Sequence, residues 1–201
     1  HSELGYSKEA WERMRDLGIL ESLIDPELNG FGGTPLDISA VFEALGRGLV
    51  VEPFLETGLV STKILGKGNE NQKKLVADLL ENIALPTFCH SENDTDYRKS
   101  YVKTKLVPDK EGNFLVTGKK VMIKNASGAS HLIITCRSSG DYADEKGITI
   151  ACIPSNRSGI DIKSFSSIDG GRVSDIHLEN VAVLKTEIIG NDGKGFEIIS
   201  E

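Results

Sequence analysis

The chain has 201 residues, of which 39% are hydrophobic and 26% charged, a composition typical of a globular protein that can bury a core. It contains no apolar run of about 18 residues and no basic start followed by an apolar stretch, so we expect no membrane span and no secretory signal. The net charge is −7, and residues 1–84 carry eight Lys or Arg against fourteen Asp or Glu. This acidity argues against a nucleic-acid partner, because a phosphate backbone would be repelled.

Three cysteines, Cys89, Cys136 and Cys152, are far apart and odd in number. This pattern predicts free thiols in a reducing compartment, and we therefore expect a cytoplasmic protein. His131 and His177 lack a cysteine or histidine at metal-ligand spacing, so the sequence predicts no metal site.

The first part of the chain has the periodicity of helices. Apolar residues recur every three or four positions, and capping residues precede them, in segments 7–18, 34–47, 52–65 and 69–82. The start at Thr34 is the clearest, because a capping residue, a first-turn proline and a first-turn acid follow one another. The glycine-rich loop 25–33 lacks the spacing of a phosphate-binding loop and follows no strand, so we expect a structural turn there.

From Leu85 onward the periodicity changes to that of strands. Short runs of β-branched and apolar residues are separated by Gly, Ser, Asp and Asn, a pattern typical of a small β-barrel or sandwich. The sequence predicts strands at 102–106, 114–116, 121–123, 131–137, 147–153, 160–165, 174–179 and 181–184, with a polar break at 118–120 and a surface turn around 164–171.

The predicted fold class is therefore α+β. A helical N-terminal domain occupies residues 1–83, and a β-barrel or sandwich domain occupies residues 84–190. Residues 191–201 read as the start of a further helical domain.

The segment Leu115–Ala126, Leu-Val-Thr-Gly-Lys-Lys-Val-Met-Ile-Lys-Asn-Ala, resembles the middle domain of acyl-CoA dehydrogenases. In that family a pattern close to Leu-Asn-Gly-x-Lys-x-(Trp/Phe)-Ile-(Thr/Ser)-Asn precedes a small-residue loop and a hydrophobic strand. Further phrases in the family's order lie at 26–33, 147–160, 172–181 and 189–196. The resemblance covers nearly the whole chain and implies the family's arrangement of helices followed by a β domain.

This resemblance implies FAD-dependent α,β-dehydrogenation of an acyl-CoA thioester, in fatty acid or sterol side-chain degradation, by a homo- or hetero-oligomer of related subunits. In the family, a glutamate in a C-terminal helical bundle removes the α-proton while the flavin accepts the β-hydride. The sequence reaches only the expected start of that bundle, so we expect a fragment without a catalytic residue, inactive by itself.

The family's flavin motif, Thr-Glu-Pro-x-x-Gly-Ser-Asp, corresponds to the segment that begins at Ser91. Ser91 replaces the threonine, Glu92 matches the glutamate, and Asn93 replaces the proline. In the second motif, Met122 stands where an aromatic residue flanks the flavin, and Lys124 stands where a hydroxyl reaches its N5 atom. By resemblance, the FAD contacts are Phe88, Ser91, Met122 and Lys124, and the acyl-CoA contacts are Phe54 and Asp96.

These departures leave two interpretations open. A lysine beside the flavin would stabilise the reduced, anionic ring, whereas a bulky cation at the N5 position would obstruct it. The chain is then either part of a catalytic dehydrogenase or part of a non-catalytic, flavin-deficient partner subunit of a heteromeric acyl-CoA dehydrogenase. For Phe54, plain core packing is the competing interpretation.

Overall fold

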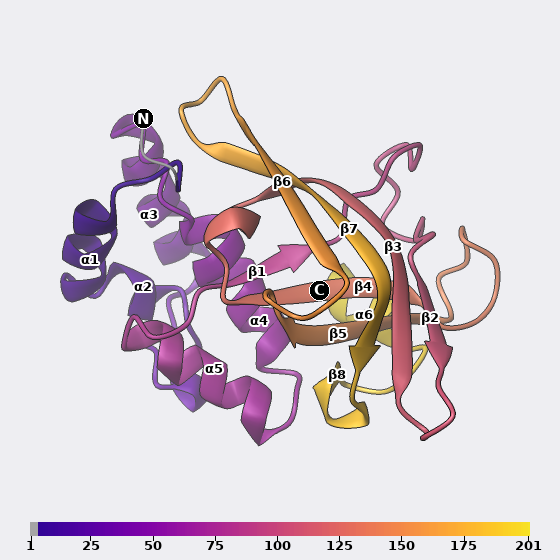
Figure 1. Ribbon diagram of the computed structural model, residues 1–201. Helices are drawn as coiled ribbons and strands as arrows, with labels where there is room; N and C mark the ends of the chain where they lie inside the picture. The colour runs from indigo at the N-terminus through magenta and orange to yellow at the C-terminus, as the bar shows by residue number, and fades with distance from the viewer. Residues whose placement is uncertain (1–3) are drawn as a thin grey trace.

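A computed structural model describes residues 4–201 and places a group of helices beside a strongly bent sheet (Figure 1). The N-terminal helices are α1 (Lys8–Asp16), α2 (Ile19–Ser22), η1 (Pro26–Leu28), α3 (Pro35–Arg47), η2 (Phe54–Ser61), α4 (Thr62–Leu65) and α5 (Glu70–Leu80). The remaining elements are β1 (Pro86–Cys89), β2 (Lys105–Pro108), β3 (Phe114–Lys124), η3 (Ala126–Gly128), β4 (His131–Arg137), β5 (Ile148–Pro154), β6 (Ile160–Ser166), β7 (Arg172–Val183), η4 (Lys185–Glu187), β8 (Ile188–Ile189) and α6 (Gly195–Ser200). The predicted α+β class, with the helices first, is confirmed.

The main helices begin where the sequence predicts, because their capping residues act locally. The backbone N–H of Ala10 donates to Ser7 Oγ at 3.2 Å, ahead of α1. At α3, Thr34 N–H donates to Asp37 Oδ2 at 2.9 Å, and Asp37 N–H donates to Thr34 Oγ1 at 3.3 Å. These contacts satisfy N–H groups that have no partner inside the first turn.

The predicted helix at 52–65 has its expected place but an unexpected geometry. The helix begins at Phe54, its first eight residues, Phe54–Ser61 (η2), form a π-helix, and α4 continues from them. Two hydroxyls bond back to the helix backbone: Ser61 Oγ donates to the Glu56 carbonyl and Thr62 Oγ1 to the Gly58 carbonyl, each at 2.6 Å. Segments of π-helix are rare and are found frequently at functional sites.

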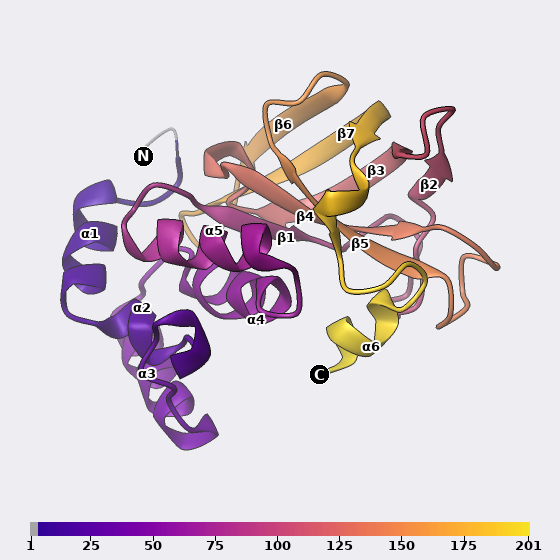
Figure 2. The same cartoon turned by 90° about the horizontal axis from the view of Figure 1, so that it is seen from below.

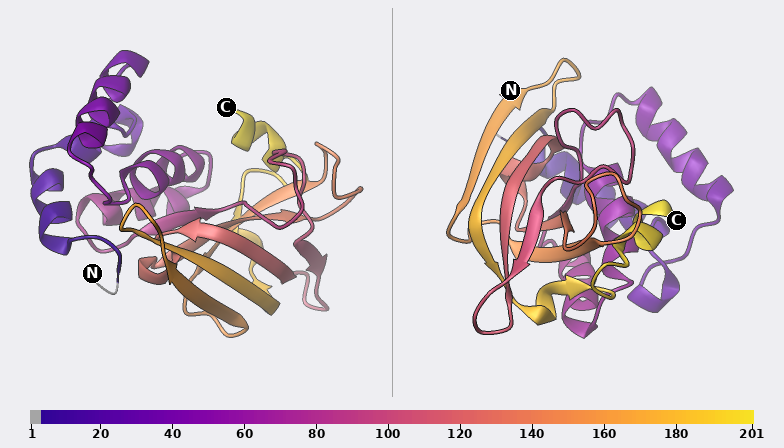
Figure 3. Two further views of the ribbon diagram at one scale, coloured as in Figure 1. Left: turned by 90° about the horizontal axis from the view of Figure 1, so that it is seen from above. Right: turned by 90° about the vertical axis from the view of Figure 1, so that its right-hand side faces the viewer.

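The strands form one sheet in the order β6-β7-β3-β2-β4-β5-β8, with β1 paired in parallel to β4. A single residue pair, Lys105 with Arg137, joins the β2 half of the sheet to the β4 half. The sheet therefore bends at this point, and β6, β7 and β3 cross in front of β4 and β5 (Figure 1). The N-terminal helices and α6 lie on the same side of the sheet (Figures 2 and 3).

Two predicted interruptions of strands are wrong. β3 runs without a break through residues 118–120, with register irregularities on either side of that segment. Gly118 permits close contact rather than a turn, since a Cβ there would lie 2.7 Å from Thr104 Cα. Likewise, β7 continues as one strand through Asn180. Its pairing with β3 changes register between Leu178 and Val181, and Asn180, within this irregular part, has a φ of 48°.

Two hydrophobic clusters stabilise the fold. In the first, helical residues such as Trp11 and Phe54 pack with Ile133 of β4 and Ile150 of β5. The second lies inside the bent sheet and includes Ile134 of β4. Neighbouring residues of β4 thus point into different clusters, as alternation along a strand requires.

The remaining sequence predictions concern cysteines, metals and membranes. Cys89, Cys136 and Cys152 are all free, as predicted, and all three are buried. Across residues 4–201 there is no cluster of three or more His, Cys, Asp or Glu side chains arranged to hold a metal. Within the same range, every helix is too short or too polar to cross a bilayer.

Candidate functional site

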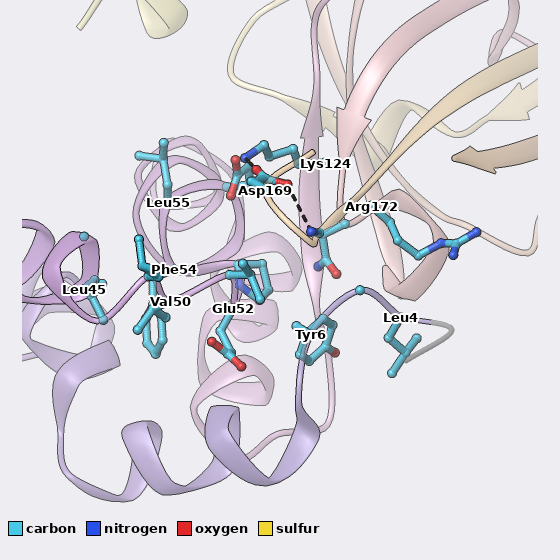
Figure 4. Close-up of a pocket in the computed structure, with 18 of the residues that line it drawn as sticks. Leu4, Tyr6, Leu45, Val50, Glu52, Phe54, Leu55, Lys124, Asp169 and Arg172 are labelled. Carbon is cyan, nitrogen blue, oxygen red and sulfur yellow. Dashed lines mark hydrogen bonds and ion pairs between the residues drawn. The ribbon is translucent and has the colours of Figure 1, made fainter. Parts of the chain in front are cut away.

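A cavity of about 590 Å³ lies between the helices and the sheet (Figure 4). Its helical side is mainly apolar, with Leu45, Val50, Phe54 and Leu55 drawn together on that side. Its sheet side carries charged groups from the end of β3 and from the turn between β6 and β7. The arrangement fits a ligand that is apolar along one part and polar at another.

The charged groups on the sheet side are Lys124, Asp169 and Arg172, of which the first two form an ion pair. Lys124 Nζ lies 3.0 Å from Asp169 Oδ2. The hydrogen bond to Asp169 raises the pKa of Lys124, and the same bond, with that from the Gly171 N–H, lowers the pKa of Asp169 to about 2. Both groups are therefore ionised at neutral pH.

A second charged pair is fully enclosed by the protein. Lys120 Nζ donates to Glu92 Oε1 at 2.7 Å, and the two side chains are 0% and 4% exposed. Glu92 also accepts the backbone N–H groups of Lys103 and Thr104, at 2.7 and 3.1 Å. Burial opposes ionisation of Glu92, but the charge and hydrogen bond of Lys120 outweigh it and lower the pKa of this carboxyl.

His90 lies beside the same pair. Its Nδ1 atom is 2.9 Å from Thr135 Oγ1, and its ring stacks on Phe88 with centroids 5.7 Å apart. Burial and, second, the charge of Lys120 lower the pKa of His90 to about 4. The imidazole is therefore neutral at pH 7.

The two segments predicted to contact the flavin lie side by side. The N–H of Val121 donates to the carbonyl of Ser91 at 2.9 Å, although 30 residues separate the two. Ser91 is exposed, and Met122, next to Val121, is 64% exposed with a φ of 56°. A hydroxyl and an apolar side chain thus reach solvent from adjoining backbone segments.

The other predicted contacts lie elsewhere. Phe54 is 1% exposed, packs on Trp11 with ring centroids 4.8 Å apart, and lines the cavity of Figure 4. Phe88 lines a second cavity, of about 700 Å³, between the η2–α4 helix and α6. Asp96 lies in an exposed loop with a φ of 48° and lines neither cavity.

Sequence reasoning missed the partners of both lysines. Asp169 was expected only as part of a surface turn, and 45 residues separate it from Lys124. Lys120 was assigned to a polar break, because a lysine inside an apolar strand gives no local sign that its charge is buried and paired. The resemblance of Glu92 to the family motif was the available signal for that pair.

Arg137, at the end of β4, organises the loops next to Ser91 and Glu92. It is 8% exposed, and its guanidinium donates to the backbone carbonyls of residues 100, 102, 142, 144 and 146 at 2.7–3.4 Å. A buried cation bonded to several carbonyls holds two loops together without a carboxylate partner.

Comparison with known proteins identifies related sequences along the chain. The family model described as "Acyl-CoA dehydrogenase, N-terminal domain" matches residues 1–80, and "Acyl-CoA dehydrogenase, middle domain" matches residues 87–181. A probable short/branched chain specific acyl-CoA dehydrogenase of Dictyostelium discoideum is 27% identical over 199 residues, which cover 92% of this chain and 48% of that protein. The chain spans about half the length of the curated relatives it matches.

Solved structures show the same fold. Butyryl-CoA dehydrogenase from Megasphaera elsdenii superimposes with a TM-score of 0.83 at 24% identity, covering 96% of this chain and 53% of that one. The Tcur3481-Tcur3483 steroid ACAD gives a TM-score of 0.83 at 22% identity, covering 96% of this chain and 50% of that one. At these identities the likeness establishes the fold alone.

Proposed function

Because the chain belongs to the acyl-CoA dehydrogenase family, we propose that it forms the N-terminal and middle parts of an FAD-dependent enzyme that oxidises the α–β bond of an acyl-CoA thioester. In this proposal residues 1–83 and 84–190 are the two domains, and residues 191–201 begin a third. The catalytic base belongs to that third domain, so residues 1–201 bind and orient but do not turn over substrate by themselves.

One observation carries the proposal: the hydrogen bond from Val121 N–H to the Ser91 carbonyl. Family resemblance assigns Ser91 and Met122 to the flavin independently, from two separate motifs. Their close approach supports a shared ligand, since one flavin can contact both motifs only if the two segments lie together.

The residues present fit a flavin. Met122 offers an exposed apolar side chain, Ser91 an exposed hydroxyl, and the ring system of FAD needs both kinds of contact. Asn125 is 6% exposed and lines the cavity of Figure 4, and its Oδ1 atom has no hydrogen-bond partner among residues 4–201. FAD, when bound, would accept the hydride that leaves the β-carbon.

On the substrate side, the apolar wall formed by Leu45, Val50 and Leu55 suits an acyl chain. Phe54 lines the same wall, and its ring packs on Trp11. Asp96 contacts the CoA moiety from its exposed loop, where solvent screens the repulsion between its carboxylate and phosphates.

A second candidate is a non-catalytic, flavin-deficient partner subunit of a heteromeric dehydrogenase. The observation that favours it is the ion pair of Lys124 with Asp169, which puts a salt bridge where the family has a hydroxyl. One structural neighbour, Tcur3481-Tcur3483, is itself named as a pair.

The visible absorption spectrum distinguishes the two candidates. The longest natural chain that contains residues 1–201 would be purified with and without added FAD, and again after co-expression with a related subunit. Near-stoichiometric flavin in the single chain supports the enzyme. Flavin only in the co-expressed form supports the partner subunit, and a colourless protein in every case contradicts both.

A further inference from the structure

We propose that Lys120 is a positioning residue that, with Glu92, fixes Ser91 and Met122 in the geometry that a flavin requires. The side chain of Lys120 is buried and does not contact the exposed atoms of Ser91 or Met122. It bonds to the backbone carbonyl of His90 and to the side-chain carboxylate of Glu92, the residues on either side of Ser91, and it lies on β3 two residues before Met122. The inference rests on the proposed function for the identity of the ligand.

The contacts of Lys120 enclose Ser91. Its Nζ atom donates to the carbonyl of His90 at 3.2 Å and to the carboxylate of Glu92 at 2.7 Å, the residues immediately before and after Ser91. Its third donor goes to Thr135 Oγ1 at 3.0 Å, on β4. An ammonium has three N–H groups, so every donor has an acceptor and the head group has one orientation.

Glu92 extends this constraint to the next segment of chain. Its carboxylate accepts the N–H groups of Lys103 and Thr104, which hold the far end of the loop that follows Ser91. The Ser91 carbonyl in turn accepts the N–H of Val121. Ser91 and Met122 are therefore exposed, while the atoms that place them are buried.

Stability alone does not account for a charged pair at this position. Removing two charges from water is costly, and replacing a buried ion pair with apolar residues of similar size is often neutral or stabilising. Both side chains are almost fully enclosed, at 0% and 4% exposure, so this cost applies in full. Fixing one arrangement of polar backbone groups is a function that apolar residues would not replace.

The test compares the double variant Lys120→Met/Glu92→Met with the wild-type protein, in the longest natural chain and with its partner subunit if one is needed. The first readout, in flavin-free protein, is the hydrogen-exchange rate of the Val121 amide. The second is the Kd for FAD, with the position of the flavin absorption bands. We expect exchange to become about tenfold faster and the Kd to rise about tenfold, because several charge-assisted hydrogen bonds around Ser91 are lost.

A matched control is Arg157→Met/Glu187→Met. Arg157 Nη2 lies 2.6 Å from Glu187 Oε1, in a partly buried pair near η4, whose residues do not contact Ser91 or Met122. This control is expected to leave both readouts unchanged. If the first double variant does not fold, Glu92→Gln keeps the side-chain volume and serves instead, with smaller changes of the same sign.

The outcomes separate the inference from the proposed function. If the variant keeps the wild-type exchange rate at Val121, the positioning role is overturned, whether or not flavin binds. If the wild-type protein takes up no FAD in any form, the proposed function fails, and the exchange rate still decides whether Lys120 fixes this backbone. Faster exchange with an unchanged Kd overturns the link to the flavin.

Discussion

Lys124 and Asp169 form an ion pair, with 3.0 Å between Nζ and Oδ2, that joins the end of β3 to the turn between β6 and β7. The two side chains are 50% and 45% exposed, so the pair contributes little to stability, about 1 kcal/mol at most. Its importance lies in holding the ammonium at the edge of the cavity shown in Figure 4.

The first prediction concerns this ammonium and a bound flavin. Lys124→Thr removes the cation and is expected to lower the flavin midpoint potential by about 20–30 mV, or about 1 kcal/mol, because a nearby positive charge stabilises the reduced, anionic ring. Asp169→Asn leaves the cation without its partner and is expected to raise the potential. Dye-equilibrated reductive titration measures both, and equal potentials in all three proteins would contradict the role of Lys124.

The second prediction concerns pH and His90. Burial lowers the pKa of His90 to about 4 in the folded protein, against an ordinary value of 6.5. Between these values the unfolded chain binds a proton that the folded chain does not, so the free energy of unfolding decreases as pH falls from about 6.5 to about 4. For this single group the decrease is at most about 3 kcal/mol.

Urea denaturation at pH 7 and pH 4.5 measures this effect. His90→Phe, which retains a ring against Phe88, is expected to show a smaller loss of stability between the two pH values than the wild-type protein. His177→Asn, on the exposed side of β7, is the control. It is expected to lose as much stability between the two pH values as the wild-type protein does. An identical pH response in His90→Phe and the wild type would rule out His90 as the source.

The third prediction concerns Arg137. Arg137→Met leaves five backbone carbonyls without their common donor and is expected to reduce the free energy of unfolding by about 2–4 kcal/mol. Loops 98–103 and 139–147 should become the first sites of cleavage in limited proteolysis. Arg13→Met, on the exposed surface of α1, is the control and is expected to change neither the free energy of unfolding nor the sites of cleavage. Unchanged cleavage of these loops in Arg137→Met would show that the guanidinium does not hold them.

The fourth prediction compares two glycines. At Gly118 a Cβ would lie 2.7 Å from Thr104 Cα, so Gly118→Ala is expected to destabilise the protein by about 1–3 kcal/mol. At Gly46, in the last turn of α3, an added Cβ meets nothing within 4 Å, so Gly46→Ala is expected to stabilise it by about 0.5–1 kcal/mol. Urea denaturation measures both changes, and a Gly118→Ala variant as stable as the wild-type protein would contradict this account of Gly118.

The sequence predicted the features that depend on neighbouring residues. Thr34 and Asp37 cap α3 through contacts three residues apart, and such contacts can be read directly from a sequence. The strands after Leu85 were predicted from their alternation, which reports burial on one side.

What the sequence did not predict depends on distant residues. Gly118 and Lys120 look like a polar break, but one accommodates Thr104 and the other is buried with Glu92. The partner of Lys124 comes from another hairpin, and no spacing in the sequence indicates it. Family resemblance selected Ser91 and Met122 as flavin residues, a prediction that the spectrum and the potentials will test.

The two hydrophobic clusters share one strand, and this has a consequence for unfolding. Ile133 of β4 packs with the helices, and Ile134 packs inside the bent sheet. Loss of the helices would expose one side of β4 and β5 to water, which removes stability from the sheet as well. The helical and β parts should therefore melt together in a single cooperative transition, and a β part expressed without residues 4–83 should aggregate through the exposed side of β4.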